Sequence, residues 1–138
     1  AQIAGAHCEV PCGIYADQAR FEQMLENTET IGKAIGQVHE LAKEHSPQVI
    51  NQAVRWVTTK EEHATDTQHI IAQYFMTQRI KPDQENYVER LTAAHGVMVA
   101  AMKCKQEAKP ETADALKQAI YKFYTAYTGK QPVFQSHE

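Results

Sequence analysis

The stretch FEQMLENTETIGKAIGQVHELA (residues 21–42) indicates what kind of fold this chain adopts. Its apolar residues recur at steps of three and four, which places them on one side of an α-helix. Ser46 and Pro47 follow, and they suit the N-cap and the first position of the next helix. We therefore predict a helix from about Asp17 to His45, with an apolar stripe formed by Phe21, Met24, Leu25, Ile31, Ala34, Ile35, Val38, Leu41 and Ala42.

Three further helices are predicted downstream. The second runs from Pro47 to the Lys81–Pro82 pair, with a bend within residues 58–62, and the third runs from near Asp83 to about Glu107. The fourth starts at Pro110 and ends at Gly129. No alternating strand pattern competes with this interpretation. The prediction is an all-α fold, an antiparallel four-helix bundle over residues 16–138 whose later apolar positions are Val49, Ile50, Ala53, Val54, Val57, Ala64, Ile70, Ile71, Tyr74, Phe75, Tyr87, Val88, Leu91, Ala94, Val97, Met98, Ala101, Met102, Leu116, Ala119, Ile120, Phe123, Tyr124 and Tyr127.

Composition narrows the classes of function. The chain has 138 residues, 43% of them apolar and 22% charged, which suits one domain with a real core. A net charge of −3 argues against nucleic acid or an anionic membrane as a partner. No segment approaches the roughly 20 apolar residues of a membrane span, and the start lacks the pattern of a signal peptide. Three cysteines suit a reducing compartment, and we expect a cytoplasmic protein.

The predicted bundle offers little metal chemistry of its own. Inward-facing Glu-x-x-His pairs, which mark di-iron bundles, are missing, and Asp66-x-x-His69 is a lone approximation. Cys104 is expected to be a buried or half-buried thiol. The remaining residues of interest are expected to lie on the surface or to pack with satisfied polar groups; these are His39, His45, His63, His69, His95, Tyr121, Tyr124 and Tyr127.

A different kind of pattern precedes the first helix. In HCEVPCGIY (residues 7–15) an imidazole and two thiolates lie within six residues, and Pro11 and Gly13 favour tight turns beside the second thiol. A Cys-x-x-x-Cys spacing alone is a weak signal and also fits a small disulfide loop. Zinc would need a fourth ligand. Two thiolates with backbone nitrogen form a planar N2S2 set, which favours nickel(II) or copper(II).

At these residues the sequence resembles the nickel superoxide dismutase family. HCEVPCGIY matches the family's hook, His-Cys-x-x-Pro-Cys-Gly-x-Tyr, at every fixed position, and the likeness continues into DQARFE (residues 17–22). The resemblance implies conversion of superoxide to oxygen and hydrogen peroxide by cycling nickel between Ni(II) and Ni(III). It further implies that Cys8 and Cys12 supply thiolates, that Cys8 supplies its amide nitrogen, and that His7 supplies an axial imidazole and a terminal amine.

The resemblance also implies roles for residues near the hook. Tyr15 would stand at the mouth of the site and order small anions or water through its hydroxyl. Glu22 falls where the family places a carboxylate that orients the axial imidazole. Lys81 is a candidate for steering the superoxide anion. The family assembles as a hexamer, so we expect a homo-oligomer.

One feature departs from the family's pattern. The family requires a free amine on the histidine, but here Ala6 forms a peptide bond with His7. We expect residues 1–6 to be the remnant of a leader or an artificial addition, residues 7–15 to be the nickel hook, and a maturation protease to cut after Ala6. The chain as written is expected to be an inactive precursor-like form, with nickel absent or the cysteines joined as a disulfide.

Two other functions stay open on the residues alone. One is a non-enzymatic bundle that binds nickel or copper and passes it on. The other is a helical interaction module in which the Cys8–Cys12 pair senses redox state.

Overall fold

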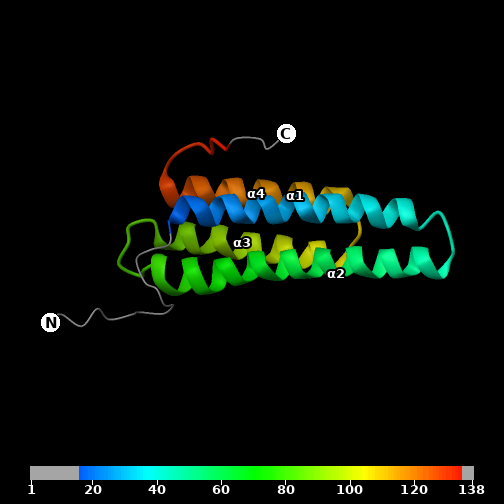
Figure 1. Cartoon of the computed structure of the whole chain (residues 1–138). Helices are drawn as coiled ribbons and strands as arrows, with labels where there is room; N and C mark the ends of the chain where they lie inside the picture. The colour runs from blue at the N-terminus through cyan, green and yellow to red at the C-terminus, as the bar shows by residue number, and fades with distance from the viewer. Residues whose placement is uncertain (1–15, 135–138) are drawn as a thin grey trace.

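A computed structural model describes residues 16–134 of the chain (Figure 1). The elements are α1 (Asp17–Leu41), α2 (Pro47–His69), a π-helical segment η1 (Ile70–Arg79), α3 (Tyr87–Gln106) and α4 (Pro110–Thr128). The described part of the chain is helical and contains no strand. Because η1 continues α2, the elements form four rods that alternate in direction, which confirms the predicted antiparallel four-helix bundle.

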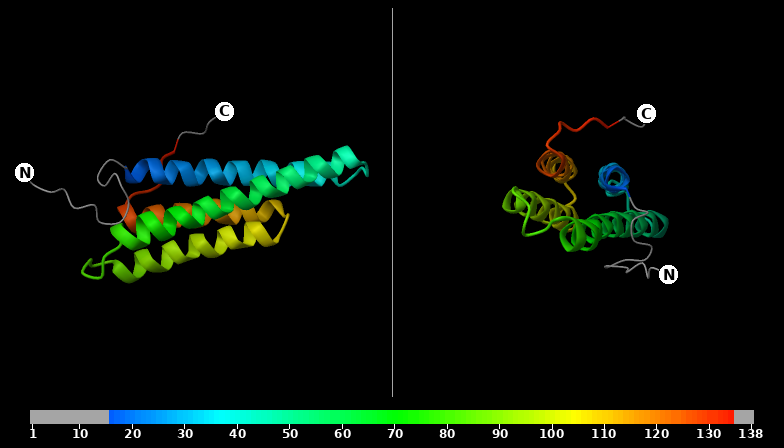
Figure 2. Two further views of the ribbon diagram at one scale, coloured as in Figure 1. Left: turned by 60° about the horizontal axis from the view of Figure 1, so that its bottom comes forward. Right: turned by 90° about the vertical axis from the view of Figure 1, so that its left-hand side faces the viewer.

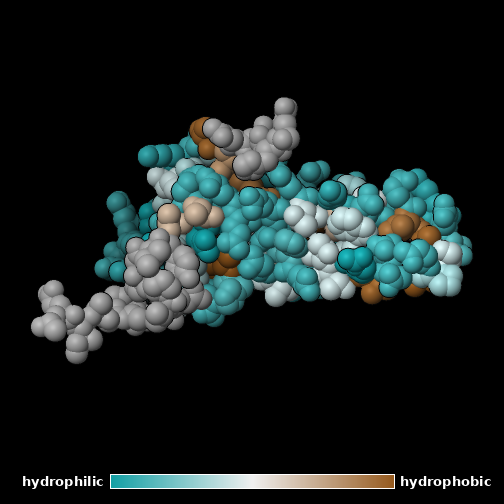
Figure 3. All heavy atoms as spheres, in the orientation of Figure 1, coloured by the Kyte–Doolittle hydropathy of each residue, from teal (hydrophilic) through white to brown (hydrophobic). Residues whose placement is uncertain are grey.

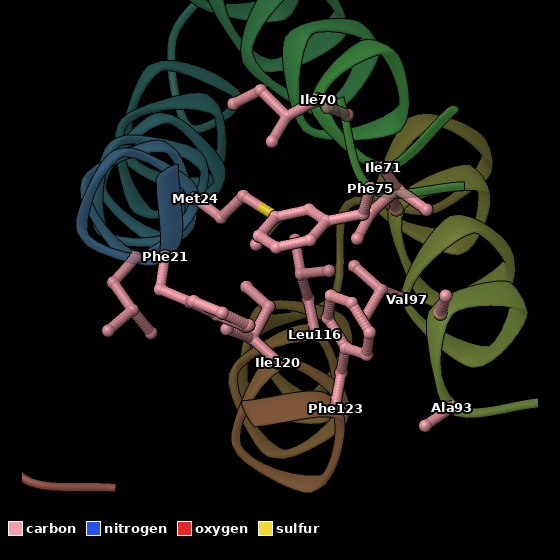
Figure 4. Packing of buried hydrophobic residues seen from close by; sticks show 14 of the residues in the cluster. Phe21, Met24, Ile70, Ile71, Phe75, Ala93, Val97, Leu116, Ile120 and Phe123 are labelled. Atoms are coloured by element: carbon pink, nitrogen blue, oxygen red, sulfur yellow. The ribbon is translucent and has the colours of Figure 1, made fainter. Parts of the chain in front are cut away.

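The four rods form a ring around one core. α1 packs against α2 and α4, and α3 packs against the same two neighbours, so chain order and spatial order agree. The end-on view in Figure 2 shows this arrangement. Side chains from all four rods meet inside it, as in the close-up of Figure 4, where Phe21 and Met24 face Phe75, Val97 and Ile120. Burial of these apolar faces is the main force that holds the bundle together.

Local signals at two helix ends act as predicted. The hydroxyl of Ser46 accepts a hydrogen bond of 3.2 Å from the Val49 amide, which caps the start of α2. Gly129 closes α4 with a φ of 71°, a left-handed conformation that glycine adopts without strain.

Two predicted helix boundaries are wrong. α1 ends at Leu41 rather than His45, since the backbone turns at residues 42–43 to reach the Ser46 cap. α3 begins at Tyr87 rather than Asp83, because Gln84 holds the preceding residues in a turn. The Gln84 side chain accepts from the Lys81 amide at 3.1 Å, and the Gln84 amide donates to the Lys81 carbonyl at 3.1 Å.

The predicted bend within residues 58–62 is also wrong. α2 passes through this polar stretch unbroken, and the helix changes character later, at Ile70. From there the hydrogen bonds span five residues instead of four. The Ile80 amide donates to the Phe75 carbonyl at 2.9 Å, and the Thr77 hydroxyl donates to the Ala72 carbonyl at 2.6 Å. π-helical segments are rare and are frequently found at functional sites.

The apolar face of α2 is buried over only part of its length. α1 and α2 extend beyond the ends of α3 and α4, so the first turns of α2 lack a covering helix (Figure 1). Ile50, Val54 and Val57, which the periodicity assigns to the core, are 60%, 59% and 41% exposed. Figure 3 shows hydrophobic atoms at this end of the molecule. Val88, at the start of α3, is likewise exposed rather than packed.

None of the helices in residues 16–134 combines the length and the apolar character that crossing a membrane demands.

Candidate metal centre and its support

The predicted hook lies outside the described residues. This holds for the predicted ligands His7, Cys8 and Cys12, for Tyr15, and for Ala6 at the predicted cleavage site. Residue 16 is the first described position, and α1 starts one residue later. The structure therefore describes the end of the bundle to which the hook is covalently attached.

A carboxylate at the start of α1 forms hydrogen bonds and an ion pair with side chains of two other elements. Asp17 Oδ1 accepts a hydrogen bond of 2.5 Å from the Tyr74 hydroxyl of η1, and Asp17 Oδ2 accepts one of 2.8 Å from the Tyr127 hydroxyl of α4. Arg79 Nε lies 3.0 Å from Asp17 Oδ1, and Arg79 Nη2 donates to the Tyr74 hydroxyl at 3.0 Å. We call these four residues, Asp17, Tyr74, Arg79 and Tyr127, the Asp17 clasp. It ties the first turn of α1 to η1 and α4.

The environment of the clasp raises the pKa values of its two tyrosines. Burial, followed by the hydrogen bond to the Asp17 carboxylate, raises the pKa of Tyr127 well above the ordinary tyrosine value. Burial and the same carboxylate raise the pKa of Tyr74, while its hydrogen bond from Arg79 acts in the opposite direction. Both hydroxyls are therefore protonated donors near neutral pH.

Aromatic rings pack beside the clasp. Phe21 lies with its ring centroid 4.9 Å from that of Phe75 and 5.3 Å from that of Phe123, and these rings meet in the core (Figure 4). The Tyr127 ring is 5.2 Å from Phe75 in an edge-on arrangement. Such pairs contribute about 0.5–1.5 kcal/mol each beyond the burial of their area. The bundle is therefore well packed at the end where the hook is attached.

Glu22 and Lys81, the two predicted site residues that the structure describes, lie at this end of the molecule. Glu22 is exposed on α1, and its Oε1 accepts a hydrogen bond of 3.0 Å from Gln18. Lys81 is exposed in the loop between η1 and α3, which Figures 1 and 2 show at the same end as the start of α1. Within residues 16–134 no ion pair joins the two.

The sequence analysis did not predict a set of polar contacts between α1 and α2, here called the polar seam, which consists of Gln23, Asn27, His63 and Asp66. Asn27, which is 4% exposed, donates to Asp66 Oδ2 at 2.8 Å, and its Oδ1 lies 2.7 Å from His63 Nδ1. Gln23 donates to the same Asp66 oxygen at 2.9 Å. The only sequence signal was a break in the apolar stripe at Asn27 and Thr28. Asp66 thus serves this seam and also borders a cavity of about 130 Å³ that Tyr74 lines from η1.

The bundle's lone cysteine is structural. Cys104 is fully buried, as predicted, and its thiol donates to the Thr112 carbonyl at 3.3 Å. Burial raises the pKa of the Cys104 thiol, so it stays protonated and unreactive. Beside it lies a charged group that the sequence did not predict to be buried: Lys60 is 3% exposed, and its Nζ donates to the carbonyls of Cys104 and Lys105.

The described bundle holds no candidate metal cluster. Among the residues that the structure describes, no group of three or more His, Cys, Asp or Glu side chains is placed to hold a metal ion. The histidines there behave as expected: His45, His69 and His95 are exposed, and His39 Nε2 lies 2.6 Å from the Ala108 carbonyl. The predicted nickel ligands are the hook residues, which precede this range.

Comparison with known proteins shows the family of the chain. No curated protein and no solved structure matches it. A family model described as nickel-containing superoxide dismutase matches residues 2–131, a range that includes the hook and nearly the whole bundle. The resemblance found in nine residues of the hook is thus shared by almost the entire sequence. The chain belongs to the nickel-containing superoxide dismutase family.

Proposed function

We propose that this chain, once cut after Ala6, dismutes superoxide with a nickel ion held by the hook at residues 7–15. The observation that carries the proposal is the family match over residues 2–131, which includes every predicted ligand. In the overall reaction two superoxide anions and two protons yield one oxygen and one hydrogen peroxide.

The donor atoms of the hook suit nickel. Cys8 and Cys12 would supply thiolates, the Cys8 amide and the His7 amine would supply nitrogens, and the His7 imidazole would supply a further nitrogen. Thiolate and amidate donors are electron-rich, and planar nitrogen–sulfur sets favour nickel or copper. The chemistry that nickel supplies when bound is a one-electron Ni(II)/Ni(III) couple.

Three further side chains would serve the reaction from nearby. Tyr15 would donate a hydrogen bond to the small anion. Glu22 would accept the free N–H of the His7 imidazole and so orient the ring. Within residues 16–134 its Oε1 accepts a hydrogen bond from Gln18, and no described group bonds to its Oε2. Lys81, exposed at the hook end of a chain with net charge −3, would raise the local concentration of superoxide.

Residues 1–6 would keep the precursor inactive. An amide nitrogen at His7 cannot act as the amine ligand, and it binds nickel only after losing a proton. We propose that a maturation protease removes these residues, that the form carrying them lacks nickel or activity, and that the mature protein is a homo-oligomer, as a hexamer, in the bacterial cytoplasm.

Three forms of the chain test this proposal: the full sequence, a form starting at Ala6 and a form starting at His7. We expect the form starting at His7 to bind one nickel and to dismute superoxide. The form starting at Ala6 should be slower by more than about tenfold, because a single peptide bond removes one ligand. Nickel content and superoxide decay are the measurements.

The same comparison separates the alternatives. Equal activity of all three forms would contradict the role of the terminal amine. Nickel or copper retention by the form starting at His7 without dismutation would favour a metal-delivery bundle. Reversible disulfide formation without metal affinity would favour a redox-sensing module.

A further inference from the structure

We propose that Asp17 is a positioning residue for the metal centre, because the Asp17 clasp fixes the point from which the hook leaves the bundle. The inference rests on the proposed function and adds to it a device outside the hook motif. The clasp consists of described residues only, and it connects three elements that are distant in sequence: α1, η1 and α4.

The first step in the argument is how α1 begins. Ala16, at the N-cap position, provides no side-chain cap. The first turn of α1 is instead held from outside, since both oxygens of Asp17 accept bonds from other elements, at 2.5 Å from Tyr74 and 2.8 Å from Tyr127. A helix start that is fixed only by a local cap would be free to shift with its own helix. This one is fixed relative to the bundle.

The second step is the π-helical segment. In an α-helix, residues five apart point about 140° away from each other. Tyr74 and Arg79 are five apart, so an α-helical register would separate them. In η1 the hydrogen bonds span five residues, which brings such a pair onto one face. Arg79 therefore lies on Tyr74, with its guanidinium carbon 5.2 Å from the ring centre, and reaches Asp17 as well. The rare register is what completes the clasp.

The third step is the short tether. Asp17 follows the last predicted ligand, Cys12, by five residues and Tyr15 by two. Five extended residues reach at most about 17 Å, so the backbone of Cys12 lies no farther than that from Asp17. A shift of the anchor is passed to the metal site, where small displacements lower turnover strongly.

The first experiment uses no metal. The full chain carries the substitutions Cys8→Ser and Gln118→Cys, and nitroxides are attached to Cys12 and to the new cysteine at the exposed position 118 on α4. Cys104 is fully buried and is therefore not labelled. Electron–electron distance distributions are measured on protein diluted with unlabelled chain. We expect Asp17→Asn and Tyr127→Phe to broaden or move the distribution. An unchanged distribution in both variants would overturn the inference.

Two controls separate positioning from general weakening of the fold. Tyr121, like Tyr127, is on α4, but its hydroxyl forms no hydrogen bond within the described residues, so Tyr121→Phe removes a hydroxyl without affecting the clasp. Lys60→Met lowers stability far from the clasp. Both should keep the parent distribution. If Lys60→Met broadens it as much as Asp17→Asn does, the clasp is merely structural and the inference is wrong.

The second experiment uses the nickel-loaded chain starting at His7 with its native cysteines. We expect Asp17→Asn to keep one nickel per chain, because the ligands are intact, while turnover per nickel falls about tenfold and the Ni(III) paramagnetic resonance spectrum changes. Unchanged turnover and spectrum would overturn the inference. If the parent neither binds nickel nor dismutes, the proposed function fails, and the metal-free experiment still decides on the clasp.

Discussion

Lys60 Nζ donates a hydrogen bond of 2.7 Å to the carbonyl oxygen of Lys105, in the last turn of α3. The same ammonium also donates to the Cys104 carbonyl. The last carbonyls of a helix lack partners within the helix, and they carry its negative dipole end. A buried cation from α2 thus caps α3, and it joins two neighbouring rods of the bundle.

Lys60→Met should lower the free energy of unfolding by about 2 kcal/mol, because two buried carbonyls lose a charged donor while the apolar stem is kept. Urea denaturation at pH 7 measures this. Lys43→Met is the matched control, since Lys43 pairs with Glu40 on the surface, where both side chains are 66% exposed. It should change stability by less than about 0.5 kcal/mol. Equal effects would contradict the capping role.

Val97→Ala and Val54→Ala should lower the free energy of unfolding by different amounts, although both remove the same two methyl groups. Val97 is fully buried, so its truncation should cost about 2 kcal/mol through lost burial and a residual cavity. Val54 is mostly exposed on the part of α2 that extends past α3 and α4, and its truncation should cost less than about 0.5 kcal/mol in the monomer. Chemical denaturation of dilute protein checks both, and similar losses would show that Val54 is covered in solution.

Cys8→Ser and Cys12→Ser in the form starting at His7 should each abolish dismutation, because a serine hydroxyl does not replace a thiolate donor to nickel. Nickel content and superoxide decay are measured together. Cys104→Ala removes the chain's other thiol, which is buried in the bundle, and should keep both properties. Activity that survives either hook substitution would rule out the thiolates as redox ligands.

Lys81→Gln should slow dismutation severalfold at low ionic strength and weaken its dependence on salt, because a positive charge near the hook attracts the anionic substrate. The rate constant is compared at low and high salt. Lys43→Gln, at the opposite end of the bundle, makes the same change in net charge. If the two variants slow the reaction equally, net charge rather than local steering is responsible.

The melting temperature should fall above pH 10 less steeply in Tyr127→Phe than in the parent chain. The pKa of Tyr127 is raised in the folded state, so its contribution to stability is complete below the unfolded pKa near 10. It is lost as the pH rises from there toward the folded pKa. Thermal melts from pH 8 to 11.5 test the sign. A Tyr127→Phe curve that coincides with the parent would contradict the assignment.

The sequence alone predicted features that depend on neighbouring residues. Four apolar stripes at helical spacing are enough to specify a bundle, since each must be buried against another. Ser46 and Gly129 act on their own helix ends, so their roles could be recognised from local chemistry. The hook could be recognised because its predicted ligands lie within six residues of one another.

The tertiary structure alone decided features that join distant residues. Asp17 meets Tyr127 across 110 positions, and Lys60 meets Lys105 across 45, and no local pattern encodes such pairs. The π register of η1 could not be predicted, because the same residues also fit an α-helical period. Exposure of Val54 depends on where α3 and α4 end, not on its own helix. Periodicity determines which side of a helix is apolar, whereas only the arrangement of all four helices determines how much of that side is covered.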